Sequence, residues 1–261
     1  MNLSPLRYPG SKAQIAENIA ISCNKEAMIE PFCGGASVGL YCLYNKIIKQ
    51  LYLNDADSGC SLFWRFLTSN TDEFIDRIVS TPITMEEREK NKIILECAKS
   101  DWKDIGFAFF FLNRVNYSGI ITSGPIGGIK QSGKYKLDCR FNKQTVINKI
   151  KKIRHLFPYI QITNDDAITA INNIPDNVFV FADPPYFQHG NSLYRTGMTK
   201  DDHKRFADFM IHDHHNALIT YDNDEYINSL YKGCTTFTFG MKYSVTSKRK
   251  DTELCIIFDR K

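Results

Sequence analysis

Short apolar runs alternate with longer amphipathic stretches at both ends of the chain, and this alternation limits the fold more than any other feature. Five of the apolar runs are expected to be strands: residues 27–30, 50–54, 159–163, 177–182 and 216–220. Two of the amphipathic stretches are expected to be helices: residues 36–47 and 199–214. This pattern is typical of parallel α/β units. A last pair of strands is expected at 235–239 and 254–258.

The middle of the chain has a different pattern. Residues 58–115 are helical in pattern throughout, which predicts a mainly helical lobe inserted into the α/β domain. Residues 117–141 contain five glycines and Pro125, which favour a β-hairpin or a mobile loop. We therefore expect a catalytic domain at 1–57 and 142–261, and an inserted target-recognition lobe at 58–141.

Composition excludes several classes of protein. The 261 residues are 43% hydrophobic and 24% charged, which is ordinary for a globular chain and excludes disorder or a coiled coil as the whole answer. No apolar run is long enough for a membrane helix, and the first residues lack the apolar core of a signal peptide. The eight cysteines are scattered and form no CxxC pair. We expect a soluble, reduced, cytoplasmic protein with no membrane partner.

Positive charge is concentrated in one segment. Residues 130–154 contain nine Lys and Arg against one acid, or +8, whereas the whole chain carries only +4. For the helical part, Lys149–Arg154, a solvated face explains the charge. The full run also includes the glycine-rich segment and Tyr135, which favours a surface that contacts phosphates.

The strongest chemical signal is Asp183-Pro184-Pro185-Tyr186, which directly follows the apolar run NVFVFA. Ligands in open α/β sheets bind beyond the carboxyl ends of the strands, so this corner is expected at the site. Prolines fix φ and lack an N–H, so they hold the Asp183 carboxylate and the Pro184 carbonyl in a rigid loop. Two acceptors beside an aromatic ring suit a planar amino group, with Tyr186 stacking on its ring.

Three motifs in order resemble the Dam-like family of DNA adenine-N6 methyltransferases: RYPGSK at 7–12, EPFCGG at 30–35, and DPPY at 183–186. The resemblance implies a Rossmann-like class I fold that uses S-adenosyl-L-methionine (SAM), with a helical DNA-recognition lobe and a β-hairpin. It also implies a double-stranded DNA substrate, whose target adenine leaves the stack and is methylated at N6. The catalytic residues that it implies are Asp183, Pro184, Pro185 and Tyr186.

The resemblance also implies the cofactor site. Glu30, Phe32, Gly34 and Gly35 belong to the turn that lines the methionine part of SAM. Tyr8 and Lys12 are expected to contact SAM, the lysine through the methionine carboxylate. Asp55 is the expected ribose ligand, whereas Asp57 better fits a helix N-cap. Asp166 is expected to face the SAM adenine, with Asp165 as the competing choice.

The expected DNA contacts follow the string Asn113-Arg114 and Tyr117-Ser118-Gly119, in which Ser118 stands where the family has asparagine. The family's usual hairpin sequence is replaced by GPIGGIKQSGKYK. Arg114 has a second interpretation, as a structural ion-pair partner. The full set of expected contacts is Arg114, Asn116, Tyr117, Ser118, Lys130, Lys134, Tyr135, Lys136, Arg140 and Asn142.

Other functions remain as alternatives. A related enzyme would methylate another planar amino group, on RNA adenine or protein glutamine. A regulator would bind SAM and DNA without turnover, and a dinucleotide oxidoreductase is disfavoured because the glycine spacing is not GxGxxG. No metal is expected, because the cluster His212–His215 ends a helix and lacks Cys/His partner spacing. We expect a monomer, with a cognate restriction endonuclease as a candidate partner.

Overall fold

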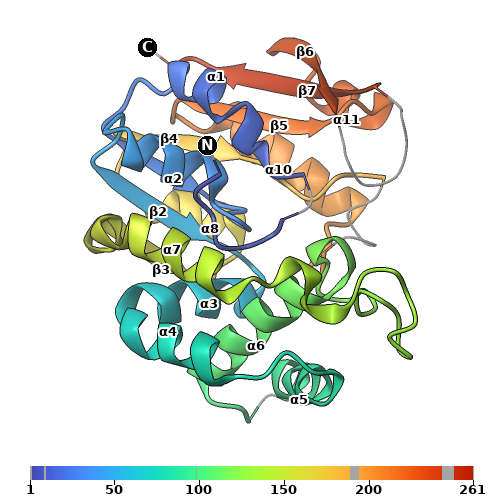
Figure 1. Cartoon of the computed structure of the whole chain (residues 1–261). Coiled ribbons are helices and arrows are strands. Elements are labelled where there is room, and N and C mark those ends of the chain that lie inside the picture. Colours follow the sequence, from blue (N-terminus) through green and yellow to red (C-terminus); the bar gives the residue numbers. More distant parts are fainter. Residues whose placement is uncertain (1, 9, 98, 189–193, 243–249, 261) are drawn as a thin grey trace.

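The structure is a computed structural model that describes residues 2–8, 10–97, 99–188, 194–242 and 250–260 (Figure 1). A seven-stranded sheet with the order β3-β2-β1-β4-β5-β7-β6 fills the upper half of the view. β7 is antiparallel to both of its neighbours, and the other pairs are parallel. The strands are β1 Ala27–Glu30, β2 Gln50–Asn54, β3 Ile160–Thr163, β4 Val178–Ala182, β5 Ala217–Asp222, β6 Thr235–Lys242 and β7 Lys250–Phe258. The expected Rossmann-like α/β class is confirmed.

The order of the strands reverses between β1 and β4, which lie side by side in the middle of the sheet. Their carboxyl ends lead into the two motifs singled out above: β1 ends at Glu30, and β4 ends one residue before Asp183. Ligands of open α/β sheets bind at such a switch point. The topology therefore places the glycine turn and the DPPY corner beside each other.

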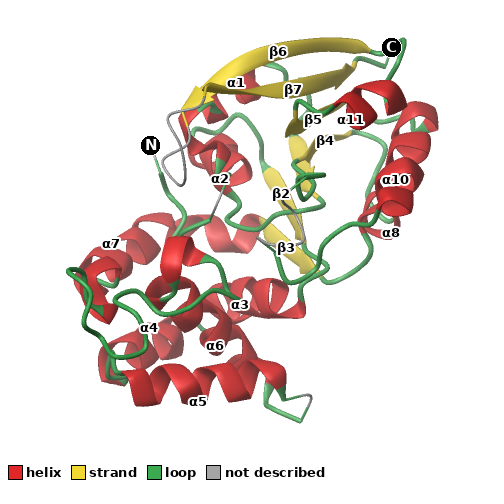
Figure 2. Ribbon diagram, turned by 90° about the vertical axis from the view of Figure 1, so that its right-hand side faces the viewer, coloured by secondary structure: helices red, strands yellow, loops and turns green. Residues whose placement is uncertain are grey.

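Helices cover both faces of the sheet (Figure 2). One hydrophobic cluster joins one face to α1 Ala16–Ile21 and α2 Ser37–Tyr44. A second cluster joins the other face to three helices: α8 Ala167–Asn172, α10 Lys200–His212 and α11 Glu225–Leu230. A strand buried on both faces is apolar throughout, which explains why all five residues of β4 are buried.

The central block is helical, as its pattern predicts. It contains α3 Ser58–Ser69, α4 Thr71–Ser80, α5 Met85–Glu96 and α6 Trp102–Val115. Aromatic rings fill the space between these helices; Phe63, for example, stacks on Phe110 at a centroid distance of 5.9 Å. The same hydrophobic cluster continues from this lobe to the sheet, so the two parts share one core.

The β-hairpin expected within residues 117–141 is a wrong prediction. The segment consists of turns, an isolated bridge between Asn116 and Pro125, and the short 3-10 helices η2 Tyr117–Gly119 and η3 Leu137–Arg140. The physical reason is that a set of positive φ angles interrupts the extended backbone: those of Ser118, Gly119, Gly127, Gly128 and Gln131. The structure thus supports the loop alternative.

Helix α7, Lys143–Ile153, connects this loop to the 3-10 helix η4, Arg154–Tyr159, and carries much of the basic run. Two of the cations, one at its start and one just after its end, have partners within the protein. Lys143 donates to the carbonyls of Val79 and Thr81 at the end of α4, both at 2.7 Å. Arg154 pairs with Asp72 at 2.6 and 2.7 Å. These contacts hold the lobe against α7, so this part of the basic run is structural.

The N-terminal segment runs through the 3-10 helix η1, Lys12–Gln14, before α1 begins. None of the described helices is both long and apolar enough to span a membrane.

Candidate active site

The DPPY corner begins at the end of β4. The Asp183 side chain is half-buried, with 24% of its surface exposed, and both prolines are buried. The Thr220 hydroxyl of β5 donates to Asp183 Oδ1 at 2.7 Å. The carboxylate is thus fixed by the neighbouring strand as well as by the rigid loop that carries it.

A buried lysine holds the same carboxylate. Lys12 Nζ lies 2.8 Å from both Asp183 oxygens, and the lysine side chain is only 1% exposed. It also donates to the Gly10 carbonyl at 2.9 Å. Burial opposes the charge on Lys12, but the Asp183 and Glu253 carboxylates outweigh burial and raise the pKa of the ammonium. Lys12 is therefore a charged partner of Asp183, and because it also lines the cavity its expected contact with the cofactor stays a prediction.

Tyr186 is anchored through its hydroxyl. The phenol donates to Glu253 Oε1 of β7 at 2.7 Å, and Lys12 Nζ lies 3.2 Å from the same hydroxyl. Burial, followed by the Asp183 and Glu253 charges, raises the pKa of Tyr186. The phenol therefore stays neutral and acts as a hydrogen-bond donor.

The glycine turn after β1 is shaped by close contacts. Gly34 has φ of +42°, and a Cβ there would lie 2.5 Å from the Tyr8 ring. Its carbonyl accepts a hydrogen bond from Trp64 Nε1 at 2.9 Å. Tyr8 itself stacks on Tyr194 with centroids 5.8 Å apart. Tyr8 thus covers Gly34, whereas Gly35 faces the cavity beside it.

Two buried carboxyl groups lie around this turn. Glu30 accepts the Gly39 N–H of α2, and burial raises its pKa to about 8. Asp55 accepts the N–H groups of Gly34 and Asp57, both at 2.9 Å, and burial raises its pKa to about 6. Both groups therefore have a larger protonated fraction at neutral pH than exposed carboxyls do.

Two further acids begin helices. Asp57 caps α3 by accepting from Gly59 N at 2.8 Å, as its sequence position predicts. Asp166 caps α8 by accepting from Ile168 N at 3.1 Å, and it pairs with Arg205 at 2.6 Å. The Arg205 hydrogen bond lowers the pKa of Asp166. Capping does not remove either acid from the site, because both also line the cavity.

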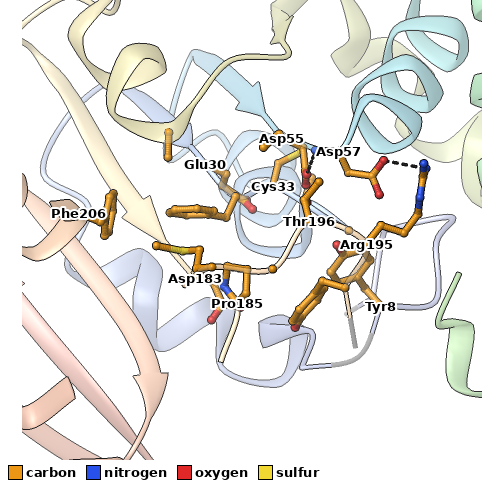
Figure 3. A pocket seen from close by; sticks show the side chains of 18 of the residues that line it. Tyr8, Glu30, Cys33, Asp55, Asp57, Asp183, Pro185, Arg195, Thr196 and Phe206 are labelled. Atoms are coloured by element: carbon orange, nitrogen blue, oxygen red, sulfur yellow. Dashed lines mark hydrogen bonds and ion pairs between the residues drawn. The ribbon is translucent and has the colours of Figure 1, made fainter. Parts of the chain in front are cut away.

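A cavity of about 220 Å³ lies between the corner and the turn (Figure 3). Most of the predicted cofactor residues line it: Tyr8, Lys12, Glu30, Phe32, Gly35, Asp55, Asp166 and Asp183. Of the DPPY corner, Asp183 and Pro185 line the cavity. Of the other described residues predicted for the site, Gly34, Pro184 and Tyr186 are not among those that line the cavity, although Pro184 and Tyr186 directly adjoin lining residues in the chain. Asp165 also lies outside it; its backbone pairs with the Asn54 side chain at 2.9 and 3.0 Å.

Several lining residues were missed by the sequence analysis. The segment after the corner contributes Tyr194, Arg195, Thr196, Gly197 and Met198, and α10 contributes Asp202, Arg205 and Phe206. Arg195 reaches across the cavity to Asp57 at 3.0 Å (Figure 3). Phe206 lies within the helix expected at residues 199–214, and its ring packs on Phe32. The one available signal was their position shortly after a catalytic corner.

Two residues of the predicted nucleic-acid set have structural roles. Asn116 is fully buried; it accepts from Arg88 Nε and donates to the Ile121 carbonyl, both at 2.8 Å. Arg114 donates to the carbonyls of Pro5 and Arg140, and burial lowers its pKa to about 10. Asn116 is too deeply buried to reach DNA in this structure, whereas Arg114 takes the structural role that was its second interpretation, and its contact with DNA stays a prediction. They anchor the loop and the N-terminal segment.

The rest of the predicted set lies on the loop surface. Tyr117 and Tyr135 are 58% and 60% exposed. Ser118 is half-buried with φ of +56°, a conformation that asparagine also tolerates. Asn142 is exposed, but its side chain caps α7 by accepting from Thr145 N at 2.9 Å. The remaining cations are exposed: Lys130, Lys134, Lys136 and Arg140.

The histidine cluster ties loops together. His214 Nε2 lies 3.1 Å from Asp176, and His215 Nδ1 lies 3.0 Å from Asp213. Asp176, His214 and His215 are close enough to share an ion, as are Cys33, Asp55 and Cys60. His215 Nε2, however, lies 3.3 Å from the Pro175 carbonyl, so both of its ring nitrogens already have partners.

Comparison with known proteins shows which family the chain matches. The family described as D12 class N6 adenine-specific DNA methyltransferase matches residues 8–247. The type II methyltransferase M.MjaIII of Methanocaldococcus jannaschii is 25% identical over 234 residues, which are 80% of this chain and 80% of that protein. The type II methyltransferase M.CviBI of Paramecium bursaria Chlorella virus NC1A is 22% identical over 224 residues, with 82% and 80% covered. Among solved structures, the rRNA methyltransferase aviRa of Streptomyces viridochromogenes aligns over 96% of this chain and 86% of that one, with a TM-score of 0.41 and 10% identity.

Proposed function

The chain belongs to the D12 class N6 adenine-specific DNA methyltransferase family, and from this premise we propose that the cavity beside Asp183 is where the amino group of adenine is methylated. The family removes the RNA, protein and oxidoreductase alternatives as first choices. The single observation that carries the proposal is the Asp183 carboxylate, held at the cavity edge by Lys12 and Thr220.

The hydrogen bonds to Asp183 indicate which of its oxygens serves adenine. Oδ1 accepts from both Lys12 and Thr220, whereas among the described residues Oδ2 accepts from Lys12 alone. A carboxylate has about four lone-pair sites, so Oδ2 retains acceptor capacity. We propose that Oδ2 accepts a hydrogen bond from one N6–H group, and that the Pro184 carbonyl accepts a hydrogen bond from the other. This draws the nitrogen lone pair away from the ring and makes it the nucleophile.

The cavity lining fits SAM in charge and shape. Acidic side chains suit its ammonium, its ribose hydroxyls and its adenine amino group, and we assign Glu30, Asp55 and Asp166 to these in that order. Phe32, Ile168 and Phe206 supply apolar walls. Lys12 lies between two carboxylates, those of Asp183 and Glu253, whereas Arg195 also lines the cavity and, among the described residues, pairs with Asp57 alone. We therefore assign the methionine carboxylate to Arg195. When bound, SAM supplies a methyl group on a positively charged sulfur.

Each residue of the corner then has a defined task. Asp183 and Pro184 orient the amino group, and most of the rate enhancement comes from this positioning. Tyr186 presents its ring to the extruded adenine; stacking on an aromatic ring contributes about 1–3 kcal/mol per base. We propose that the exposed cations of residues 130–140 contact the phosphates of duplex DNA. The type II names of both relatives support a restriction endonuclease as the functional partner.

The test is to treat duplex DNA with SAM and the protein, and then to identify the methylated nucleoside by mass spectrometry. N6-methyladenine is expected from the wild type, and at least 100-fold less from Asp183→Ala. Cytosine as the modified base, or equal yields from the two proteins, would contradict the proposal. Methylation-aware sequencing of the product gives the recognised site for the later experiments.

A further inference from the structure

Glu253 is a buried carboxyl group that the mechanism above does not use. It lies on β7 opposite Asp222 of β5, and its side chain is 1% exposed. Its Oε1 accepts from the Tyr186 phenol at 2.7 Å and lies 3.4 Å from Lys12 Nζ. Among the described residues, no group hydrogen-bonds to Oε2. Glu253 is not one of the described residues that line the cavity, so it acts through its neighbours.

We propose that Glu253 is a positioning residue for methyl transfer: it holds the Tyr186 phenol and the Lys12 ammonium, so that ring and carboxylate meet the same adenine. The inference rests on the proposed roles of Asp183 and Tyr186. Glu253 thereby links the antiparallel strand β7 to the corner after β4.

Glu253 restricts the side chain of Tyr186. The two prolines fix the backbone before this residue, but they do not fix rotation of its side chain. The hydrogen bond to Glu253 fixes the far end of the ring. Gly10 lies beside the same hydroxyl, since a Cβ built there would be 3.2 Å from it. The hydroxyl end of the ring is therefore enclosed by β7 and the N-terminal segment.

Glu253 also restricts the ammonium of Lys12. An ammonium has three N–H donors, and four groups compete for them: the Gly10 carbonyl, Asp183, the Tyr186 hydroxyl and Glu253. Glu253 and Asp183 flank the ammonium with opposite charge. Moving Glu253 away would let Lys12 shift toward Asp183 and rotate its carboxylate. The orientation of Asp183 thus depends on Glu253.

The protonation state of Glu253 decides which substitution is conservative. Burial raises its pKa to about 7, and the Lys12 charge opposes this shift. The group is therefore partly ionised near neutral pH, and in either form Oε1 can accept the hydrogen bond of the Tyr186 phenol. Glutamine reproduces that arrangement, with an amide group at the position of Oε2. Leucine keeps the volume and removes the acceptor.

The test compares Glu253→Gln and Glu253→Leu on a duplex that carries the recognised site, with thermal unfolding to confirm folded protein. Single-turnover methylation is expected to remain within about threefold of wild type for the glutamine variant. It is expected to fall by about 10–100-fold for the leucine variant, the scale of small misplacements of reacting groups. The dissociation constant for SAM should change by less than about threefold in both. Thr252→Val is the matched control, because Thr252 is the exposed neighbour on β7 and should leave the rate unchanged.

Two further readouts separate positioning from a structural effect. Tyr186→Phe removes the hydroxyl that Glu253 holds, so Glu253→Leu should cost less in that background than in the wild type. With 2-aminopurine at the target position, the emission of the bound duplex should change for Glu253→Leu and remain unchanged for Glu253→Gln, because only leucine frees the Tyr186 ring.

Three results would overturn the inference: a wild-type single-turnover rate for Glu253→Leu, a loss that appears entirely as weaker SAM binding, or rate losses of Glu253→Leu and Tyr186→Phe that simply multiply. Failure of the proposed function is distinguishable, because it would appear as full activity of Asp183→Ala. An inactive Asp183→Ala with a fully active Glu253→Leu overturns only the role of Glu253.

Discussion

Glu30 makes the binding of SAM dependent on pH. This residue ends β1, lines the cavity and is only 4% exposed, and burial raises its pKa to about 8. If the SAM ammonium binds beside it, the carboxyl group must ionise. A group with a pKa of about 8 is about 90% protonated at pH 7, so binding should release about 0.9 proton from Glu30. The association constant should then rise with pH, by up to about tenfold per unit below pH 8.

Calorimetry in two buffers with different ionisation enthalpies measures this proton release directly. Glu30→Gln is the control, because glutamine keeps an acceptor for the Gly39 N–H and cannot ionise. Protons released by SAM itself cancel in the comparison. We expect the variant to release about one proton fewer at pH 7 and to show a correspondingly shallower pH dependence. Equal proton release by the two proteins would refute the reasoning.

Three other predictions concern stability and DNA binding. The pKa of Glu30 is higher in the folded protein than its ordinary 4.5, so the folded state holds the proton longer and stability falls as pH rises through this window. Between pH 6 and pH 8 the free energy of unfolding in urea should fall by up to about 2 kcal/mol more for the wild type than for Glu30→Gln. Parallel pH profiles for the two proteins would exclude this. Gly34→Ala should destabilise the protein by about 1–3 kcal/mol, because the new Cβ meets the Tyr8 ring. Gly128→Ala is the control, because Gly128 also has a positive φ but lies in open space, so that the substitution adds only backbone strain. Equal unfolding midpoints of the two variants would show that the Tyr8 contact is unimportant. Arg114→Met should lower stability by about 2 kcal/mol, because hydrogen bonds from a charged group are lost. Lys134→Ala should leave stability unchanged and should reduce the salt dependence of DNA binding by about one phosphate contact. Unchanged stability and a reduced salt dependence for Arg114→Met would instead support Arg114 as a DNA ligand.

Features of the fold that depend on nearby residues were predictable. The strands at 27–30 and 50–54 have the predicted bounds, because buried strands are short apolar runs between turn residues. The helical lobe was likewise visible in its periodicity. The predicted helix at 36–47 is shorter, Ser37–Tyr44, because Lys46 adopts a positive φ that ends the helical backbone. The predicted strands 235–239 and 254–258 lengthen to Thr235–Lys242 and Lys250–Phe258, where each pairs with the other.

Contacts between distant residues account for what the sequence did not predict. Lys12 lies 171 residues from Asp183, and an isolated lysine gives no sign of which carboxylate it meets. Arg114 was assigned to DNA from its motif, yet its partners are carbonyls of Pro5 and Arg140, and backbone acceptors leave no trace in a sequence. The loop at 117–141 departs from a hairpin partly because Gln131 adopts a positive φ, which residue type does not predict.

The central claim is that the charged Asp183 carboxylate orients the adenine amino group at the cavity. Its most direct test is the single-turnover rate of Asp183→Asn with saturating SAM and DNA, because asparagine keeps the size of the side chain and replaces one acceptor oxygen with a donor. We predict that both ligands still bind and that transfer slows by at least about 100-fold, comparable to the removal of a single stabilising group in other enzymes. Transfer at the wild-type rate would contradict the account.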